Sequence, residues 1–203
     1  MKKEVVLASR NEGKLAEMQA MLAALGWNLR LLSDFSHGAA EETATTFVEN
    51  AILKARYAAQ VTGLPAIADD SGLEVDALAG APGVRSARYA GDNASDIENN
   101  QKLLQALKNT PDGQRTARFV SVMVYLRSAD DATPVIAQGS WRGSILHNPR
   151  GTHGFGYDPL FHVAEHKCSS AELDAAIKNK VSHRARAAKH LYSLLHDAGL
   201  GGH

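Results

Sequence analysis

The sequence predicts a single α/β domain, residues 1–203, built on a mixed β-sheet. Apolar runs of strand length alternate with helical patterns along the first half of the chain. Two long β-rich runs, residues 116–127 and 135–146, are separated by a short turn, which favours antiparallel pairing between them. A chain of 203 residues also fits one domain, at roughly 150 residues per domain.

The first elements are expected close to the N-terminus. Residues 5–8 form a short apolar run, which predicts a buried strand. A helix follows, because apolar residues recur at helical spacing as far as Gly26, a residue that suits a helix end. Residues 29–32 are a candidate second strand, and the polar residues 33–45 predict a loop. The apolar face of the helix consists of Leu15, Met18, Leu22 and Leu25.

The second helix is expected over residues 46–62, where small apolar residues share one face and Gly63 follows. A short strand at 66–68 runs into two aspartates. Ser95 and Glu98 form a capping box that opens a helix through residue 107. The remaining expected elements are an irregular segment at 80–91, the strands at 116–127 and 135–146, a glycine-rich loop at 148–158 and a last helix over 182–197.

Composition excludes several classes of protein. Lys plus Arg equals Asp plus Glu, 22 each, so a dedicated nucleic-acid-binding protein is disfavoured and an anionic ligand needs a local cationic cluster. Cys168 is the single cysteine, which excludes an internal disulfide and a multi-thiolate metal site. No apolar run approaches the roughly 20 residues of a membrane span, and the apolar run at 5–8 is too short for a signal peptide. We expect a cytoplasmic enzyme or binding protein with no membrane partner.

Residues 9–14, between the first strand and the first helix, are a candidate phosphate site. A helix N-terminus offers free backbone N–H groups and the positive end of the helix dipole. Ser9 and Asn11 precede the helix, and Lys14 adds a positive charge one turn further on. The P-loop pattern is absent. A plain helix cap with a solvated lysine explains the same residues.

Asp69 and Asp70 follow an apolar strand and are candidates for catalysis. Carboxylates at a strand end can hold Mg²⁺, which keeps water and phosphate oxygens as its other ligands. Successive strand residues point to opposite faces, so the two groups would differ in role, one binding metal and the other orienting or deprotonating a water. The alternative is a turn made by residues 69–72.

A further acidic pair, Glu41 and Glu42, precedes the helix that carries Lys54. Lys54 lies next to Ala55 at the edge of the apolar stripe, where it could point toward a cleft beside the sheet. An acidic, solvated loop with a surface lysine is the other interpretation.

Two segments near the C-terminus could bind a base. Phe155 or Tyr157, in the glycine-rich loop, could stack on a planar ring, or both could be core aromatics beside a turn. Lys178 and residues 182–184 offer donors that could contact keto groups of a base. A serine helix cap with surface basic residues is the alternative for this second segment.

Together these segments resemble the inosine/xanthosine triphosphate pyrophosphatase family, in particular its bacterial branch. They occur in the family's order from residue 5 to about residue 195, so the resemblance covers nearly the whole chain. The matching pieces are residues 9–14, 41–43, 49–55, 68–73, 80–89, 154–161 and 182–184.

The resemblance implies an elongated mixed central sheet flanked by helices, two lobes with a cleft between them, and a homodimer. It implies Mg²⁺-dependent hydrolysis of non-standard purine nucleoside triphosphates (ITP, dITP and XTP) to the monophosphate and pyrophosphate. Asp70 would be the general base and a metal ligand, with Asp69, Lys54 and Glu42 in the catalytic set. Glu42 or Glu41 would be the second metal ligand. The implied substrate-binding residues are Ser9, Arg10, Asn11, Glu12, Gly13, Lys14 and Ser71 at the phosphates, and Phe155, Gly156, Tyr157, Asp158, Lys178, His183 and Arg184 at the base and ribose.

Two positions depart from the family's pattern. Arg10 stands where a small residue is expected, which could alter the phosphate loop, and His153 stands where a glycine is expected. Two other functions compete: a pyrophosphatase acting on modified pyrimidine nucleotides, and a nucleotide-binding module without turnover. The intact set of Asp69, Asp70, Glu42 and Lys54 argues against the second.

Overall fold

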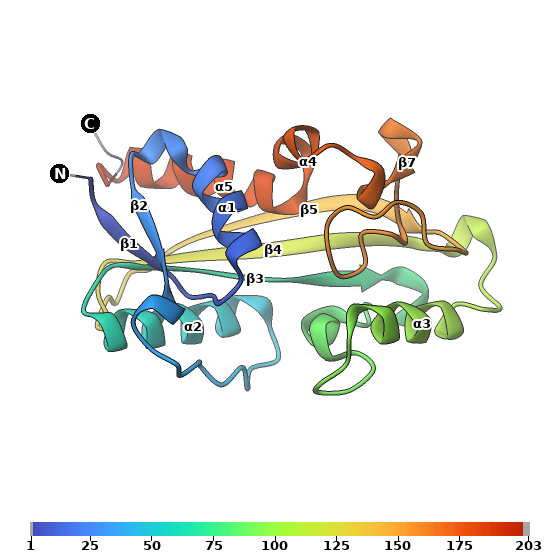
Figure 1. Cartoon of the computed structure of the whole chain (residues 1–203), viewed down its shortest axis with the longest axis horizontal. Coiled ribbons are helices and arrows are strands. Elements are labelled where there is room, and N and C mark those ends of the chain that lie inside the picture. Colours follow the sequence, from blue (N-terminus) through green and yellow to red (C-terminus); the bar gives the residue numbers. More distant parts are fainter. Residues whose placement is uncertain (1, 201–203) are drawn as a thin grey trace. The chain divides into compact units, whose positions relative to one another are not determined.

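A mixed β-sheet is the framework of the fold (Figure 1). The computed structural model describes residues 2–200. Within them the strands are β1 (Glu4–Leu7), β2 (Asn28–Leu31), β3 (Ala66–Val75), β4 (Thr116–Leu126), β5 (Val135–Ile145), β6 (Phe161–Val163) and β7 (Cys168–Ser169). They are ordered β2-β1-β3-β4-β5-β6-β7. β1 pairs in parallel with β2 and β3, whereas β6 pairs antiparallel with β5 and β7, so the predicted α/β class and mixed sheet are confirmed.

The chain divides into two compact units. The first contains the chain up to Asp70, Ser121–Gly139 and the chain from Arg184 onward; the second contains Ser71–Val120 and Ser140–His183. The expected single domain, residues 1–203, stays a prediction, and its residues 1 and 201–203 lie outside the described residues. The expected elongation and cleft also stay predictions.

In the first unit, helices cover both faces of the sheet (Figure 1). The helices of the chain are α1 (Glu12–Met21), α2 (Phe47–Thr62), α3 (Asp96–Ala106), α4 (Ala175–Val181) and α5 (His183–Asp197). Val5 and Leu7 of β1 share a buried cluster with residues of α1 and α5. Val6, between them, joins a cluster with Ala58 and Ala59 of α2. The alternation of side chains along β1 therefore decides which helix packs on which face.

The second unit has its own core of aliphatic and aromatic side chains. Leu103 of α3 is buried there among strand residues. Phe161 packs against Phe119 and Trp141, with ring centroids 4.5 and 5.2 Å apart. A Cβ at Gly143 would lie 2.4 Å from the backbone oxygen of His162, so only glycine allows the close approach of β5 and β6.

The structure corrects several sequence predictions. The first helix ends at Met21 and a short 3₁₀ turn, Ala23–Leu25, follows it, with Gly26 at φ 66° as the stop. The strand expected at 66–68 continues to Val75, so the turn proposed for residues 69–72 is wrong. β7 and α4 are elements that the sequence patterns missed, because each is too short to show a period.

Other expectations are confirmed. α2 begins after the Thr46 cap and ends at Gly63, as predicted. The capping box of Ser95 and Glu98 opens α3. The two long strands, β4 and β5, are neighbours in the sheet. No helical segment among residues 2–200 has the length and hydrophobicity that a membrane span requires.

The ionised Asp131 carboxylate stabilises the fold in a pH-dependent way. It is buried and accepts hydrogen bonds from Arg127 Nε at 2.8 Å and from the Thr133 backbone at 3.0 Å. The hydrogen bonds from Arg127 hold the pKa of Asp131 below its ordinary value. Because the folded-state pKa is lowered, this stabilisation is present above pH ~4 and is lost as the pH falls further.

We expect Asp131→Asn to lower the free energy of unfolding at pH 7 by about 1–3 kcal/mol. The difference from the wild type should shrink as the pH falls below about 4. Urea unfolding at several pH values measures this, with Asp130→Asn, at an exposed neighbour, as the control. A difference that does not change with pH would contradict the assignment.

Candidate active site

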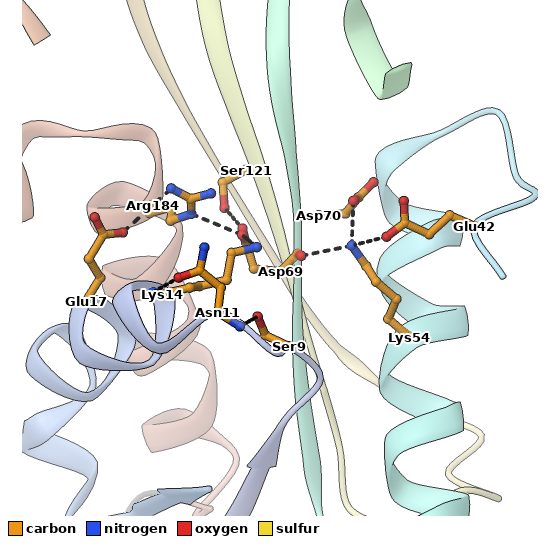
Figure 2. Close-up of polar contacts among 10 residues, drawn as sticks. All are labelled: Ser9, Asn11, Lys14, Glu17, Glu42, Lys54, Asp69, Asp70, Ser121 and Arg184. Atoms are coloured by element: carbon orange, nitrogen blue, oxygen red, sulfur yellow. Dashed lines mark hydrogen bonds and ion pairs between the residues drawn. The ribbon is translucent and has the colours of Figure 1, made fainter. Parts of the chain in front are cut away.

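Asp69 is the centre of a buried charge cluster in the first unit (Figure 2). Its Oδ2 lies 2.8 Å from Lys14 Nζ of α1 and accepts a hydrogen bond from Arg184 Nε of α5 at 3.1 Å. Its Oδ1 accepts a hydrogen bond from Ser121 Oγ of β4 at 2.5 Å. Burial alone would raise the pKa of Asp69, but Lys14 and Arg184 outweigh it and hold the pKa well below its usual range. The ionised form of Asp69 is therefore favoured, and its contacts link α1, β4 and α5.

Asp70 faces a different partner, Lys54 of α2. Lys54 Nζ lies 2.6 Å from Asp70 Oδ1 and donates to the backbone oxygen of Asp69 at 3.1 Å. The pKa of Asp70 is raised because burial outweighs the opposing charge of Lys54. Asp70 Oδ2 is buried and has no hydrogen-bond partner among residues 2–200. β3 directs the two aspartates to opposite faces, as expected, and their different roles stay a prediction (Figure 2).

Lys54 also binds Glu42, at 3.0 Å from Oε1. Burial lowers the pKa of Lys54, but the negative charges of Asp70 and Glu42 outweigh it and leave the pKa raised. Lys54 is therefore a stable cation held between two carboxylates, and the alternative of a surface lysine is wrong. Glu41 is exposed, so the structure joins Glu42 rather than Glu41 to the cluster.

A pocket of about 270 Å³ opens beside these groups in the first unit. Its lining includes Ser9, Arg10, Lys14, Glu42, Lys54 and Asp69. Each of the two lysines is matched by a carboxylate in the lining, whereas Arg10 has no ion pair with any residue that the structure describes. Arg10 therefore gives the pocket its net positive charge.

The turn before α1 forms the expected helix cap, and its phosphate-binding role stays a prediction. Asn11 is the helix cap, and its Oδ1 accepts a hydrogen bond from the Lys14 backbone at 2.9 Å. Ser9 Oγ accepts one from the Asn11 backbone at 3.1 Å. The Lys14 side chain is not solvated but bound to Asp69, so that part of the alternative is wrong. Glu12 and Gly13 are exposed in the first turn, and their contact with a substrate stays a prediction.

A second cluster, in the second unit, surrounds the buried Asp158. The Lys178 ammonium group donates to Asp158 Oδ2, and Ser170 Oγ donates to Oδ1 at 2.8 Å. The Phe155 backbone donates to the same carboxylate at 3.0 Å. Gly154, at φ 79°, allows this close approach, since a Cβ there would collide with Asp158. The Phe155 ring is 39% exposed and lies 5.4 Å from Lys178 Nζ.

Two other predicted residues have structural contacts within the second unit. Tyr157 is buried, and its hydroxyl donates to the Ser86 backbone oxygen at 2.8 Å. His183 is buried and stacks on Phe119, with ring centroids 4.8 Å apart. Because Lys178, His183 and Arg184 are all buried, their assignment to a basic surface is wrong. The substrate contacts of Ser71, Gly156 and Tyr157 stay predictions.

Sequence reasoning missed Ser121 and Glu17. Ser121 is fully buried in the apolar run of β4, and a lone polar residue in such a run is the pattern that could have identified it. Glu17, 3.6 Å from Arg184, has no comparable sequence pattern.

The fold and the first cluster together define an α/β protein with a cationic pocket bordered by carboxylates, a construction suited to phosphorylated ligands. The profile of the Ham1 family matches residues 5–194, and the chain belongs to this family.

Named relatives agree with this assignment. The chain is 53% identical over 195 residues to the dITP/XTP pyrophosphatase of Vibrio cholerae, an alignment that covers 96% of this chain and 98% of the relative. It is 59% identical over 184 residues to the dITP/XTP pyrophosphatase of Pseudomonas aeruginosa, covering 91% and 92%. The solved structure of a Ham1 protein from Coxiella burnetii is 50% identical, with a TM-score of 0.89, and the match covers 96% of this chain and 99% of that one. These findings confirm the family resemblance and the fold class, and the chain is a hydrolase.

Removing the Asp69 charge should be costly for stability. Asp69→Asn would leave the buried Arg184 and the partly buried Lys14 without their shared anion. We expect it to lower the free energy of unfolding by about 3–5 kcal/mol in a urea titration. Asp34→Asn is the control, because the ion pair of Asp34 with Arg30 is exposed and is worth about 1 kcal/mol or less. Equal effects of the two substitutions would contradict the proposed central role of Asp69.

Proposed function

We propose that this chain hydrolyses the non-standard purine nucleoside triphosphates dITP, XTP and ITP to the nucleoside monophosphate and pyrophosphate, with Mg²⁺ as cofactor. The names of its relatives, dITP/XTP pyrophosphatases, support the substrate class. The observation that carries the proposal is the contact of Lys54 with Asp70 and Glu42 beside a cationic pocket. It combines an anion-binding group with acceptor oxygens for a metal.

The carboxylates fit a magnesium ion. Mg²⁺ in nucleotide enzymes is usually held by one or two carboxylates, and substrate phosphates and water complete its octahedron. No group of three or more His, Cys, Asp or Glu side chains within residues 2–200 could hold a metal unaided. Asp70 and Glu42 supply two carboxylates, and Asp70 Oδ2 is a buried acceptor without a hydrogen-bond donor in the described chain. When bound, Mg²⁺ would neutralise phosphate charge and lower the pKa of a nearby water.

The reaction needs a base beside the attacking water. Asp70 is suited to this role, since its raised pKa makes it a better proton acceptor than an exposed aspartate. The water oxygen attacks the α-phosphorus and transfers a proton to Asp70. The bond from the α-phosphorus to the bridging oxygen breaks, and pyrophosphate leaves with that oxygen. Asp69 stays ionised throughout and holds Lys14 and Arg184 in position.

The purine ring of the substrate is assigned to the cluster around Asp158. The half-exposed ring of Phe155 offers a stacking surface, and Lys178 and His183 offer donors for a 6-oxo group. Adenine carries an amino donor at that position, which would leave these protein donors unpaired, a cost larger than the loss of one contact.

Three expectations accompany this function. We propose that the protein is a homodimer, which light scattering would test. A cytoplasmic location and the lack of a nucleic-acid partner also stay predictions.

The alternative of a pyrimidine-specific pyrophosphatase uses the same phosphate-binding residues, so only a substrate panel separates the two.

The central experiment measures pyrophosphate release from ITP, dITP, XTP, ATP, GTP and dUTP with Mg²⁺. We expect fast release from the three 6-oxo substrates and slow release from the others. Asp70→Asn should lower kcat by about 100-fold or more, because the base is lost. Asp92→Asn, at an exposed aspartate, serves as the control. Fast release from dUTP alone would favour the pyrimidine alternative, and orthophosphate as product would contradict the proposed bond cleavage.

Arg10 should affect binding more than turnover. We expect Arg10→Gln to raise KM for dITP about five- to tenfold with little change in kcat, since a charged hydrogen bond to phosphate is lost away from the scissile bond. The effect should weaken at high salt, because Arg10 is exposed. Steady-state kinetics at two ionic strengths measure it, with the exposed Arg142→Gln as the control. An unchanged KM would place Arg10 outside the phosphate site.

A further inference from the structure

The loop that carries Glu42 lacks the usual backbone support. Residues 36–46 form neither helix nor strand. Lys54 and Asp70, by contrast, belong to α2 and β3, whose backbone hydrogen bonds fix their positions. Glu42 is nevertheless held 3.0 Å from Lys54, and a second contact joins its loop to α2.

Asn50 of α2 provides that contact. Its Oδ1 accepts a hydrogen bond from the Ala44 backbone N–H at 3.0 Å, and its Nδ2 donates to the Ala44 backbone oxygen at 3.4 Å. The Asn50 side chain is only 1% exposed, so water cannot easily replace these bonds. One amide thus satisfies both backbone groups of a residue two positions after Glu42.

The spacing along α2 links this contact to the site. Asn50 and Lys54 are four residues apart, so they lie on the same face of the helix. Asn50 fixes the loop at Ala44, and Lys54 binds the loop at Glu42. A third contact between the loop and α2 is at Gly38, where a Cβ would come within 1.9 Å of the Tyr57 hydroxyl. The loop is therefore packed along α2 from Gly38 to Ala44.

We propose that Asn50 is a positioning residue that holds Glu42 in place for the metal-binding role. Asn50 does not line the pocket. Its effect passes through the Ala44 backbone to the Glu42 carboxylate. The metal role of Glu42 is part of the proposed function, so this part of the inference depends on it.

A matched control exists in the second unit. Asn99 of α3 makes the same two kinds of bond, to two residues instead of one: its Oδ1 accepts from the Ala90 backbone at 2.8 Å and its Nδ2 donates to the Ala87 oxygen at 3.1 Å. It is 2% exposed, close to the value for Asn50. Asn99→Ala therefore removes the same bonds at the same burial, away from Glu42.

The experiment compares Asn50→Ala, Asn99→Ala and wild type in two assays. For turnover of dITP, we expect Asn50→Ala to raise the Mg²⁺ concentration at half-maximal rate by about 10–100-fold, as is usual when the support of a metal ligand is lost. Asn99→Ala should leave this concentration unchanged. Hydrogen exchange of the protein without metal should accelerate at residues 41–46 in Asn50→Ala and not in Asn99→Ala.

The two assays separate the two proposals. If wild type has no turnover, the proposed function fails, and hydrogen exchange still tests the contact. If wild type turns over and both variants respond alike to Mg²⁺, or if exchange at 41–46 is unchanged, the role of Asn50 is overturned. Should Asn50→Ala fail to fold, Asn50→Asp keeps the acceptor for Ala44, loses the donor and adds a negative charge, so this variant is followed by hydrogen exchange alone. Exchange at residues 41–46 should accelerate in Asn50→Asp, and a wild-type result would overturn the role of Asn50.

Discussion

Two adjacent carboxylates buried in one strand impose the main constraint on this structure. A buried carboxylate is costly unless cations and hydrogen bonds compensate it. Asp69 and Asp70 point to opposite faces of β3, so no single layer can compensate both. Lys14 and Arg184 reach Asp69 from α1 and α5, and Lys54 reaches Asp70 from α2. The helices on both faces are therefore required by the site as well as by the core.

The same constraint separates the chemistry of the two aspartates. Asp69 faces two cations and a serine hydroxyl, which lower its pKa and keep it charged. Asp70 faces Lys54, which is shared with Glu42, and burial raises its pKa. The two neighbouring aspartates thus have pKa shifts of opposite direction. In enzymes, such pairs give one carboxylate an ionised, structural role and the other a proton-accepting role. The proposed division of roles follows from the environment of each group rather than from its identity.

Local features were predictable from the sequence, and long-range ones were not. The limits of α2 follow from Thr46 and Gly63, which act within one helical turn. The partners of Asp69 lie 55 and 115 residues away, at Lys14 and Arg184, and no periodic pattern relates such distant positions. The resemblance to a family brought those segments together, but it did not reveal Ser121, which acts only through contact with Asp69. Short elements such as β7 depend on their neighbours in the sheet and have no pattern of their own.

Asp70, Lys54 and Glu42 lie in elements of different rigidity. Asp70 lies in a strand and Lys54 in a helix, so moving either would break a hydrogen-bonded ladder. Glu42 lies in a loop that α2 fixes through one amide and one lysine. Because Mg²⁺ requires near-octahedral geometry, small displacements of a single ligand alter its affinity strongly. If Glu42 holds Mg²⁺ as proposed, substitutions near Ala44 change the metal response without disturbing the Asp69 cluster. Changes at Asp69, by contrast, reach α1, β4 and α5 at once. The loop is thus the part of the site that can vary while the fold stays intact.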